Sequence, residues 1–239
     1  MAEYRAGRPL SGYAHLMQNA GLTWSQDLGA VTELLSGEFF QPLGRSSSHQ
    51  VWSSAMVLSP ALRGLFGLDW DAPHRTLRLR PSLPAAWDSV RLRNVPLGGI
   101  RLEVEMRREA GRLLIQASSA VSEVVCLAAQ DAPREESCRA PAAVMHKLAL
   151  PLPPVELGLE HRLPLAGSRT AELKVLDERA SANRLDVALE APGGSAWNLP
   201  LRLNRPNVRV EGAAIVGGRL HVRFPAGDGY QRQAVAFVW

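Results

Sequence analysis

The sequence predicts a mainly β protein in which two or three α-helices precede an antiparallel β-sandwich. Apolar residues recur with helical spacing before residue 70, whereas the short runs after it alternate apolar and polar residues. Gly, Pro and Asn separate these short runs, as is typical of an antiparallel sandwich. The chain has 239 residues and is 46% hydrophobic, which suffices for a substantial core. We therefore expect a helical part over residues 1–70 and a sandwich over residues 71–239.

An apolar stripe predicts a helix over residues 27–35, and a shorter helix is expected over residues 12–19. The stripe follows one face of a helix and consists of Leu28, Val31, Leu34 and Leu35.

A longer helix is expected over residues 47–66. The serines at positions 46 to 48 can cap its N-terminus with their side-chain oxygens. Pro60 has no backbone N–H, so we expect it to kink the helix or to begin a new first turn. The apolar stripes of this helix and of the helix over 27–35 form an association surface if they stay uncovered. We therefore expect these helices either to pack on the sandwich or to mediate self-association.

The sandwich is expected to consist of short strands with one apolar and one charged face. The run over 100–106 alternates most regularly. Gly217 and Gly218 lie between two such runs and predict a tight hairpin. The strands are expected over residues 75–80, 89–93, 100–106, 112–117, 123–127, 172–175, 184–189, 199–203, 208–210, 219–224 and 234–238.

The charge pattern argues against a nucleic-acid partner. The formal net charge is +4, and 25 of the 27 basic residues are arginines. These arginines are spread through the expected strands, and aromatic residues make up only 6% of the chain. A nucleic-acid-binding surface typically has a basic stripe with interleaved aromatic residues. We therefore expect no nucleic-acid partner.

Targeting, membrane and cofactor signals are also not expected. No apolar run reaches the roughly 20 residues of a membrane span, and the N-terminus lacks a signal-peptide pattern, which favours the cytoplasm. Cys126 and Cys138 stand twelve residues apart without metal-binding spacing. They can form a disulfide, but free thiols are expected. The histidines are scattered and no phosphate-binding glycine loop is present, so we expect no metal and no cofactor.

A loop between the two expected helices contains the main candidate site. Glu38 stands beside Phe39 and Phe40. Such a set suits a sugar, because an apolar ring face stacks on an aromatic side chain while the hydroxyls need polar partners. Glu38 is thus a candidate catalytic carboxylate; alternatively it is an exposed residue after a helix end.

Three further residues of this segment belong to the candidate site. Arg45 either binds a substrate oxygen or forms an ion pair with Glu38. His49 and Trp52, near the start of the second helix, either contact the substrate or serve in capping and core packing.

The segment over 33–67, with GRSSSHQVWSSAM at 44–56, resembles the last helical hairpin of bacterial six-hairpin glycosidases. These (α/α)6-barrel enzymes are described as glycogen-debranching-like or amylo-α-1,6-glucosidase-like. The stretch over 67–87, with PSLPAAW at 81–87, is similar to their passage into an appended β-sandwich. The resemblance implies that Glu38 is the general base and that the ligand is an α-glucan or another oligosaccharide.

Three hypotheses about function follow. The first is the C-terminal part of a carbohydrate-active glycoside hydrolase, incomplete and inactive alone. An inverting glycosidase needs two carboxylates roughly 6.5–9.5 Å apart, and the acidic residues of the helical part supply one candidate, Glu38. The second hypothesis is a non-catalytic sandwich that binds carbohydrate or a partner protein. The third is a structural β protein unrelated to glycosidases.

Overall fold

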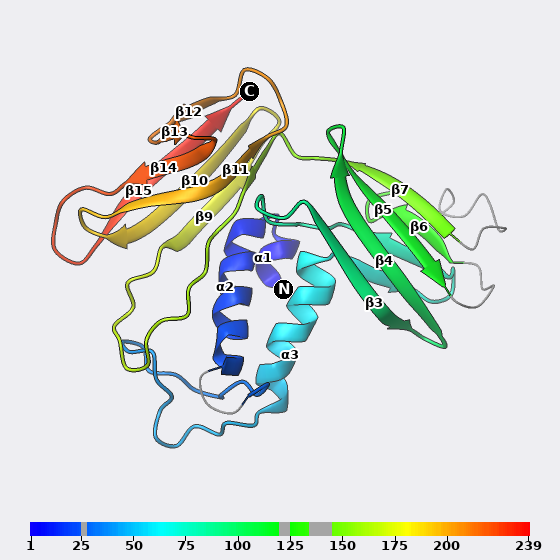
Figure 1. Cartoon of the computed structure of the whole chain (residues 1–239), viewed down its shortest axis with the longest axis horizontal. Helices are drawn as coiled ribbons and strands as arrows, with labels where there is room; N and C mark the ends of the chain where they lie inside the picture. The colour runs from blue at the N-terminus through cyan, green and yellow to red at the C-terminus, as the bar shows by residue number, and fades with distance from the viewer. Residues whose placement is uncertain (25–27, 120–124, 134–144) are drawn as a thin grey trace.

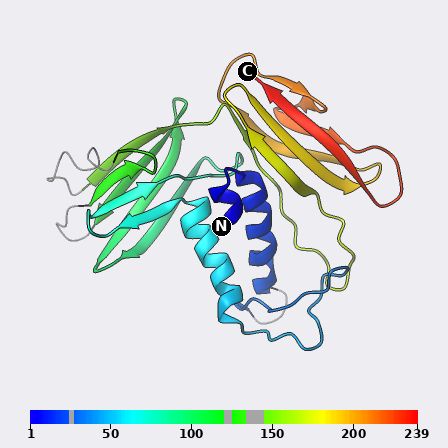
Figure 2. The same ribbon diagram turned by 180° about the vertical axis from the view of Figure 1, so that it is seen from behind.

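The computed structural model describes residues 1–24, 28–119, 125–133 and 145–239. Strands account for 44% of it and helices for 16%, which confirms the mainly β fold class with preceding helices. Figure 1 shows the helices in the centre, with one group of strands on either side. Figure 2 shows the same arrangement from behind.

Two antiparallel helices dominate the central layer (Figure 1). Helix α2 (Pro9–Gly21) follows the short α1 (Ala2–Arg5) and ends in the 3-10 turn η1 (Leu22–Trp24). Helix α3 (Val51–Ser59) returns along α2 and continues as a π-helical turn, η2 (Pro60–Leu65). The helices expected over 12–19 and 47–66 are thus confirmed. The expected irregularity at Pro60 is confirmed as well, because a residue without an N–H cannot continue the regular hydrogen-bond ladder.

The expected serine cap of α3 is wrong. Gln50 is the N-cap residue of α3, and its side chain makes no capping hydrogen bond. Ser46 instead accepts a hydrogen bond from the Leu34 N–H at 2.8 Å, and its hydroxyl lies 2.6 Å from that of Thr32. The serines therefore tie two parts of the preceding loop together.

The helix expected over 27–35 is also wrong: the structure describes residues 28–35 as irregular chain, while Asp27 lies outside the described residues. Gly29 has a φ of +83°, which a right-handed helix does not accommodate. The Ser36 side chain accepts hydrogen bonds from the nearby N–H groups of Glu38 and Phe39, and local bonds of this kind compete with helix formation. Of the apolar stripe only Val31 is buried.

The strands form two separate sandwiches with two separate cores, where the sequence predicted one. The first sandwich packs a sheet of order β1-β2-β6 against a sheet of order β3-β4-β5-β7. Its pairings are antiparallel except for the parallel pair β2–β6. Its strands are β1 (Leu68–Asp71), β2 (Thr76–Leu79), β3 (Ser89–Leu97), β4 (Ile100–Glu109), β5 (Arg112–Ser119), β6 (Cys126–Ala129) and β7 (Met145–Pro151).

The second sandwich packs a sheet of order β12-β15-β10-β9 against a sheet of order β13-β14-β11-β8. The hairpin expected at Gly217 and Gly218 is confirmed, with φ values of +57° and +73° between β13 and β14. Its strands are β8 (Val155–Leu157), β9 (Lys174–Ala180), β10 (Arg184–Pro192), β11 (Ala196–Leu203), β12 (Arg209–Glu211), β13 (Ala214–Val216), β14 (Arg219–Arg223) and β15 (Tyr230–Val238).

Every run expected as a strand overlaps an observed strand, and residues 123 and 124 of one run lie outside the described residues. The expectation of free thiols is wrong for Cys126, which is disulfide-bonded. Cys138 lies outside the described residues.

The helical layer has a small core of its own, which joins it to both sandwiches. Tyr4, Tyr13, Leu16 and Leu65 are buried together. Trp87 of the first sandwich and Leu159 of the second pack against this cluster. The ring of Trp87 meets that of Tyr13 edge to face, with centroids 6.3 Å apart.

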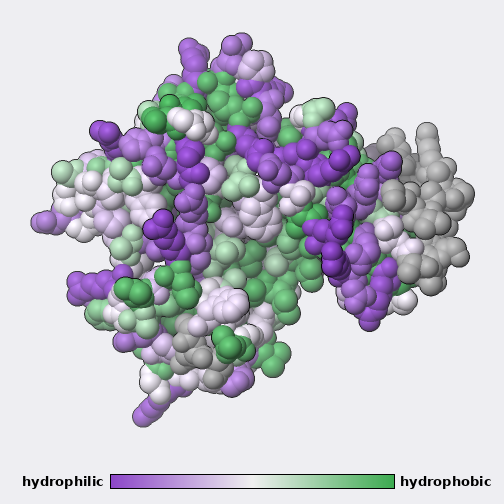
Figure 3. Space-filling view, in the orientation of Figure 1, coloured by the Kyte–Doolittle hydropathy of each residue, from purple (hydrophilic) through white to green (hydrophobic). Residues whose placement is uncertain are grey.

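The outer face of α3 and η2 is apolar and exposed. Figure 3 shows hydrophobic residues gathered on the surface in the region where α3 lies. The exposed fractions are 86% for Val51, 61% for Trp52, 61% for Met56, 63% for Leu58 and 40% for Leu62.

Candidate functional site

A hairpin over residues 35–42 presents Glu38 at its tip. Leu35 and Pro42 form an antiparallel bridge at its base, and the Ser36 N–H donates to the Gln41 carbonyl at 2.9 Å. The Ser36 hydroxyl accepts hydrogen bonds from the N–H groups of Glu38 and Phe39 at 3.2 and 3.1 Å. These bonds fix the backbone that carries Glu38, in a turn typical of serine.

The hairpin docks on the loop that connects β8 to β9 of the second sandwich. The Phe40 N–H donates to the Ser168 carbonyl at 2.8 Å, and the Gly167 N–H donates to the Phe40 carbonyl at 2.9 Å. Phe39 pairs with Arg169 as an isolated antiparallel bridge. The candidate site is therefore built from two segments about 130 residues apart in the sequence.

Arg169 contacts both Glu38 and Phe39. Its guanidinium nitrogen Nη2 lies 2.6 Å from Glu38 Oε1, and its guanidinium carbon lies 5.6 Å from the centroid of the Phe39 ring. The side chains of Arg169 and Glu38 are 74% and 59% exposed. Because of this exposure, both charged groups are accessible to a ligand. An exposed ion pair of this kind adds little to stability.

The structure separates the remaining expected residues from this cluster. Arg45 is exposed, and the ion pair considered for it is made by Arg169 instead. The ring nitrogen Nδ1 of His49 lies 2.9 Å from the hydroxyl of Ser48. Trp52 is on the exposed face of α3, which corrects its expected role in core packing. His49 forms hydrogen bonds with Ser47 and Ser48, whereas Glu38 pairs with Arg169.

The hairpin can bind a hydroxyl-rich ligand but does not by itself complete a hydrolytic site. Glu38 accepts hydrogen bonds, Arg169 donates them, and Phe39 and Phe40 offer apolar rings. In the part of the chain that the structure describes, the hydrogen bonds and ion pairs of this hairpin include no second carboxyl group. It therefore holds at most one of the two carboxylates that glycoside hydrolysis uses.

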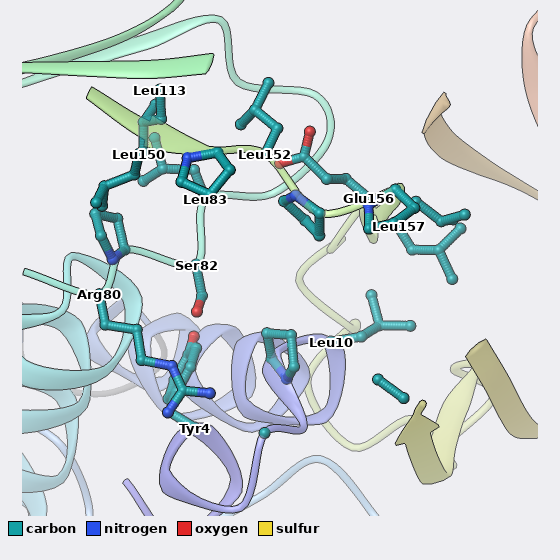
Figure 4. Close-up of a pocket in the computed structure, with 18 of the residues that line it drawn as sticks. Tyr4, Leu10, Arg80, Ser82, Leu83, Leu113, Leu150, Leu152, Glu156 and Leu157 are labelled. Carbon is teal, nitrogen blue, oxygen red and sulfur yellow. The ribbon is translucent and has the colours of Figure 1, made fainter. Parts of the chain in front are cut away.

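A cavity of about 720 Å³ lies where the helices meet both sandwiches. Figure 4 shows the hydroxyls of Ser82 and Tyr4 pointing toward one another on one side of it. The Tyr4 hydroxyl is buried without a hydrogen-bond partner among the described residues. Most of the labelled residues are apolar: Leu10, Leu83, Leu113, Leu150, Leu152 and Leu157.

Glu178 of β9 lies in the wall of this cavity and binds the start of α2. Its carboxylate oxygen Oε2 accepts the Leu10 N–H at 2.9 Å. Pro9, the first residue of the helix, has no N–H, so this bond satisfies one of the first free helical donors. Burial raises the pKa of Glu178 to about 7, although the N–H groups of Leu10 and Ser11 and the charge of Arg8 oppose the rise.

Sequence reasoning missed Arg169 and Glu178. Each belongs to the second sandwich and meets residues of the helical part that are more than 100 positions away. Local spacing carries no signal for such contacts. Only the three-dimensional structure shows that Glu178 lies beside Leu10 and that Arg169 lies beside Glu38.

No cluster of three or more His, Cys, Asp or Glu side chains that could hold a metal ion occurs within the described ranges. The helices in those same ranges are too short or too polar to span a bilayer. Scans against protein-family models, curated proteins and solved structures returned no significant match to this chain.

Proposed function

We propose that the chain is the C-terminal part of a carbohydrate-active glycoside hydrolase that acts on α-glucan oligosaccharides and is inactive alone. In this proposal α2 and α3 belong to an (α/α)6 barrel, and Glu38 is its general base. The resemblance of residues 33–67 to the last hairpin of such barrels supports the assignment.

The observation that carries the proposal is the apolar face of α3. A surface helix normally buries its apolar side chains and exposes its polar ones. In α3 and η2 five large apolar residues are exposed instead, Trp52 and Met56 at 61% each among them. An apolar patch of this kind marks an interaction surface. Further helices of a barrel are partners of the required shape and chemistry.

The position of Glu38 agrees with this role. The Ser36 hydroxyl fixes its backbone, and Arg169 orients its carboxylate. The proposal requires that further helices on the apolar face of α3 also reach the hairpin. They then supply the second carboxylate, which acts as the general acid.

The reading frame upstream of Met1 tests the proposal first. We expect it to encode further helical hairpins, in frame or across a frameshift. A protein that joins those hairpins to this chain is expected to hydrolyse maltooligosaccharides, whereas the chain alone is not.

Variants of the joined protein then test the residue. Glu38→Gln is expected to lower kcat by at least about 100-fold, the usual contribution of a general base. Glu33→Gln, in the same loop, is the matched control and is expected to keep kcat. An upstream region without helical hairpins, or an unchanged kcat in Glu38→Gln, contradicts the proposal.

A second candidate function is a non-catalytic module that binds carbohydrate or a partner protein. The hydrogen bonds and ion pairs described for the hairpin favour it, because they bring Glu38 to an arginine and to no second carboxyl group. This function predicts sugar binding by the chain alone that Phe39→Ala or Trp52→Ala abolishes. Absence of binding at millimolar maltooligosaccharide removes it.

A further inference from the structure

A second cleft, separate from the Glu38 hairpin, lies between helix α2 and the second sandwich. Its volume is about 450 Å³, within the range of small-molecule sites. Residues of α2 form one wall, and strand β11 with residues 159–162 forms the other. In Figures 1 and 2 helix α2 is the helix that faces the second sandwich.

The cleft has an aromatic and apolar base. Trp197 is half-buried, packs against the core of the second sandwich and also lines the cleft. Its indole N–H donates to the Ser195 hydroxyl at 3.2 Å, which fixes the orientation of the ring. Tyr13 and Met17 of α2 line the opposite wall. An aromatic ring held in this way offers a flat surface for the apolar face of a pyranose.

Polar side chains surround this base and offer both donors and acceptors. Gln18, Arg162 and Glu172 line the cleft, and within the described ranges no hydrogen bond or ion pair involves their side chains. Asn198 accepts a hydrogen bond from His221 through Oδ1 at 2.7 Å, so its amide nitrogen keeps its donors. A mixed set suits sugar hydroxyls, because each hydroxyl donates one hydrogen bond and accepts others.

The charges of the cleft favour a neutral ligand. Arg162 and Glu172 have opposite charges, and Glu160 is already paired with Arg219. A phosphate or another anion normally selects a surplus of arginine or lysine, and an organic cation selects a surplus of carboxylates or an aromatic cage. Because Arg219 neutralises Glu160, the remaining charges of the cleft, those of Arg162 and Glu172, balance.

We propose that this cleft binds one or two neutral pyranose units of an oligosaccharide, with Trp197 as the stacking platform. Gln18, Arg162, Glu172 and Asn198 bind the hydroxyls. This site goes beyond the proposed catalytic role, because it shares no residue with the Glu38 hairpin and can bind sugar in the isolated chain.

Titration of the full chain with maltotriose and cellotriose, followed by calorimetry and ligand-observed NMR, tests the proposal. We expect binding of at least one of the two in the millimolar range or tighter. Trp197→Ala is expected to weaken it by about tenfold or more. Because Trp197 also contacts the core, its replacement can destabilise the fold. Gln18→Ala and Glu172→Gln change an exposed and a half-buried residue instead, and each is expected to weaken binding severalfold.

Arg91→Ala is the control, because Arg91 is exposed on β3 of the first sandwich and does not line the cleft. It is expected to leave binding unchanged. Binding that is lost in Trp52→Ala but kept in the Trp197, Gln18 and Glu172 variants assigns the sugar to the α3 surface and overturns this proposal. The absence of binding by both trisaccharides up to about 20 mM also overturns it. Neither result decides whether Glu38 is catalytic in the joined protein.

Discussion

Arg108 of β4 and Glu156 of β8 form a buried ion pair that connects the two sandwiches. Arg108 Nη2 lies 2.5 Å from Glu156 Oε1, and the two side chains are only 7% and 8% exposed. Arg108 also donates to the carbonyls of Leu83 and Trp87, while Asn204 donates to Glu156 Oε2 at 2.8 Å. The pair therefore has the additional hydrogen bonds that a buried charge needs.

Removal of one partner is expected to destabilise the protein strongly. Arg108→Leu leaves the Glu156 carboxylate buried without its counter-charge, and Glu156→Leu does the same to Arg108. Each single variant is expected to lower the free energy of unfolding by about 3–5 kcal/mol, measured by urea denaturation. The double variant is expected to lose clearly less than the sum of both, because it leaves no unpaired charge.

An exposed ion pair is the matched control for this comparison of single and double variants. Arg91 and Glu105 lie 2.7 Å apart with side chains that are 55% and 38% exposed. Their replacement is expected to cost at most about 1 kcal/mol. Strictly additive losses at Arg108 and Glu156 contradict a coupled buried pair.

The second prediction concerns the pH dependence that Glu178 produces. Its pKa rises from 4.5 to about 7 because it is buried. The folded protein therefore holds the proton more tightly than the unfolded chain. The resulting stability is fully present below about pH 4.5 and is lost as the pH rises through about 7, and its size is about 3 kcal/mol.

Glu178→Gln isolates this contribution, since the amide keeps an oxygen that can accept the Leu10 N–H. We expect the wild type to lose stability relative to Glu178→Gln as the pH rises from about 5 to about 8. Urea midpoints of both proteins across this range provide the measurement. Parallel pH profiles of the two proteins exclude an elevated pKa at this position.

The local sequence pattern predicted much of the secondary structure. A strand with one buried face needs apolar residues at every second position, so its sequence alternates apolar and polar residues. In β4, Ile100, Leu102, Val104 and Met106 are all buried, as the alternation requires. Helix spacing over 27–35 had no such support, since Gly29 and the side-chain bonds of Ser36 favour an irregular path. Periodicity reports which face can be buried, and not whether a partner buries it.

The division into two sandwiches could not be predicted from pattern. The strand lengths of the two sandwiches overlap, from 4 to 10 residues in the first and from 3 to 9 in the second, and the link between β7 and β8 is short. The pairing of β2 with β6 brings together strands about 50 residues apart, which local spacing does not encode. The candidate site shows the same limit, because Glu38 was identified from its neighbours in sequence whereas Arg169 is its neighbour only in space.

The third prediction concerns Gly67, where the chain leaves η2 and enters β1. Its φ is +62°, and a Cβ at this position would lie 2.1 Å from the Arg80 carbonyl oxygen. The Arg80 N–H also donates to the Gly67 carbonyl at 3.0 Å, so neither backbone can easily move away. Gly67→Ala is expected to lower the free energy of unfolding by about 1–3 kcal/mol or more, measured by thermal or urea denaturation.

Gly44→Ala is the control for this substitution, because Gly44 has open space around its Cα and no positive φ. Its effect is expected to stay within about 0.5 kcal/mol. Equal stability of the two variants contradicts the close approach of the two backbones at Gly67.

The fourth prediction concerns the exposed face of α3. Trp52, Met56 and Leu58 expose more than half of their side chains on one short helix. Water exposure of such a patch is unfavourable by roughly 25 cal/mol per Å² of apolar surface. The isolated chain is therefore expected to self-associate with increasing concentration in light scattering and to bind a hydrophobic dye.

Met56→Glu is expected to reduce both effects, because a charge in the middle of the patch must be desolvated on association. Val216→Ser at the tip of the β13–β14 hairpin is the matched control: Val216 is 59% exposed but lies in the second sandwich, away from α3. It is expected to change neither effect. A chain that stays monomeric at all concentrations, or equal association of both variants, shows that contacts other than the α3 face govern its assembly.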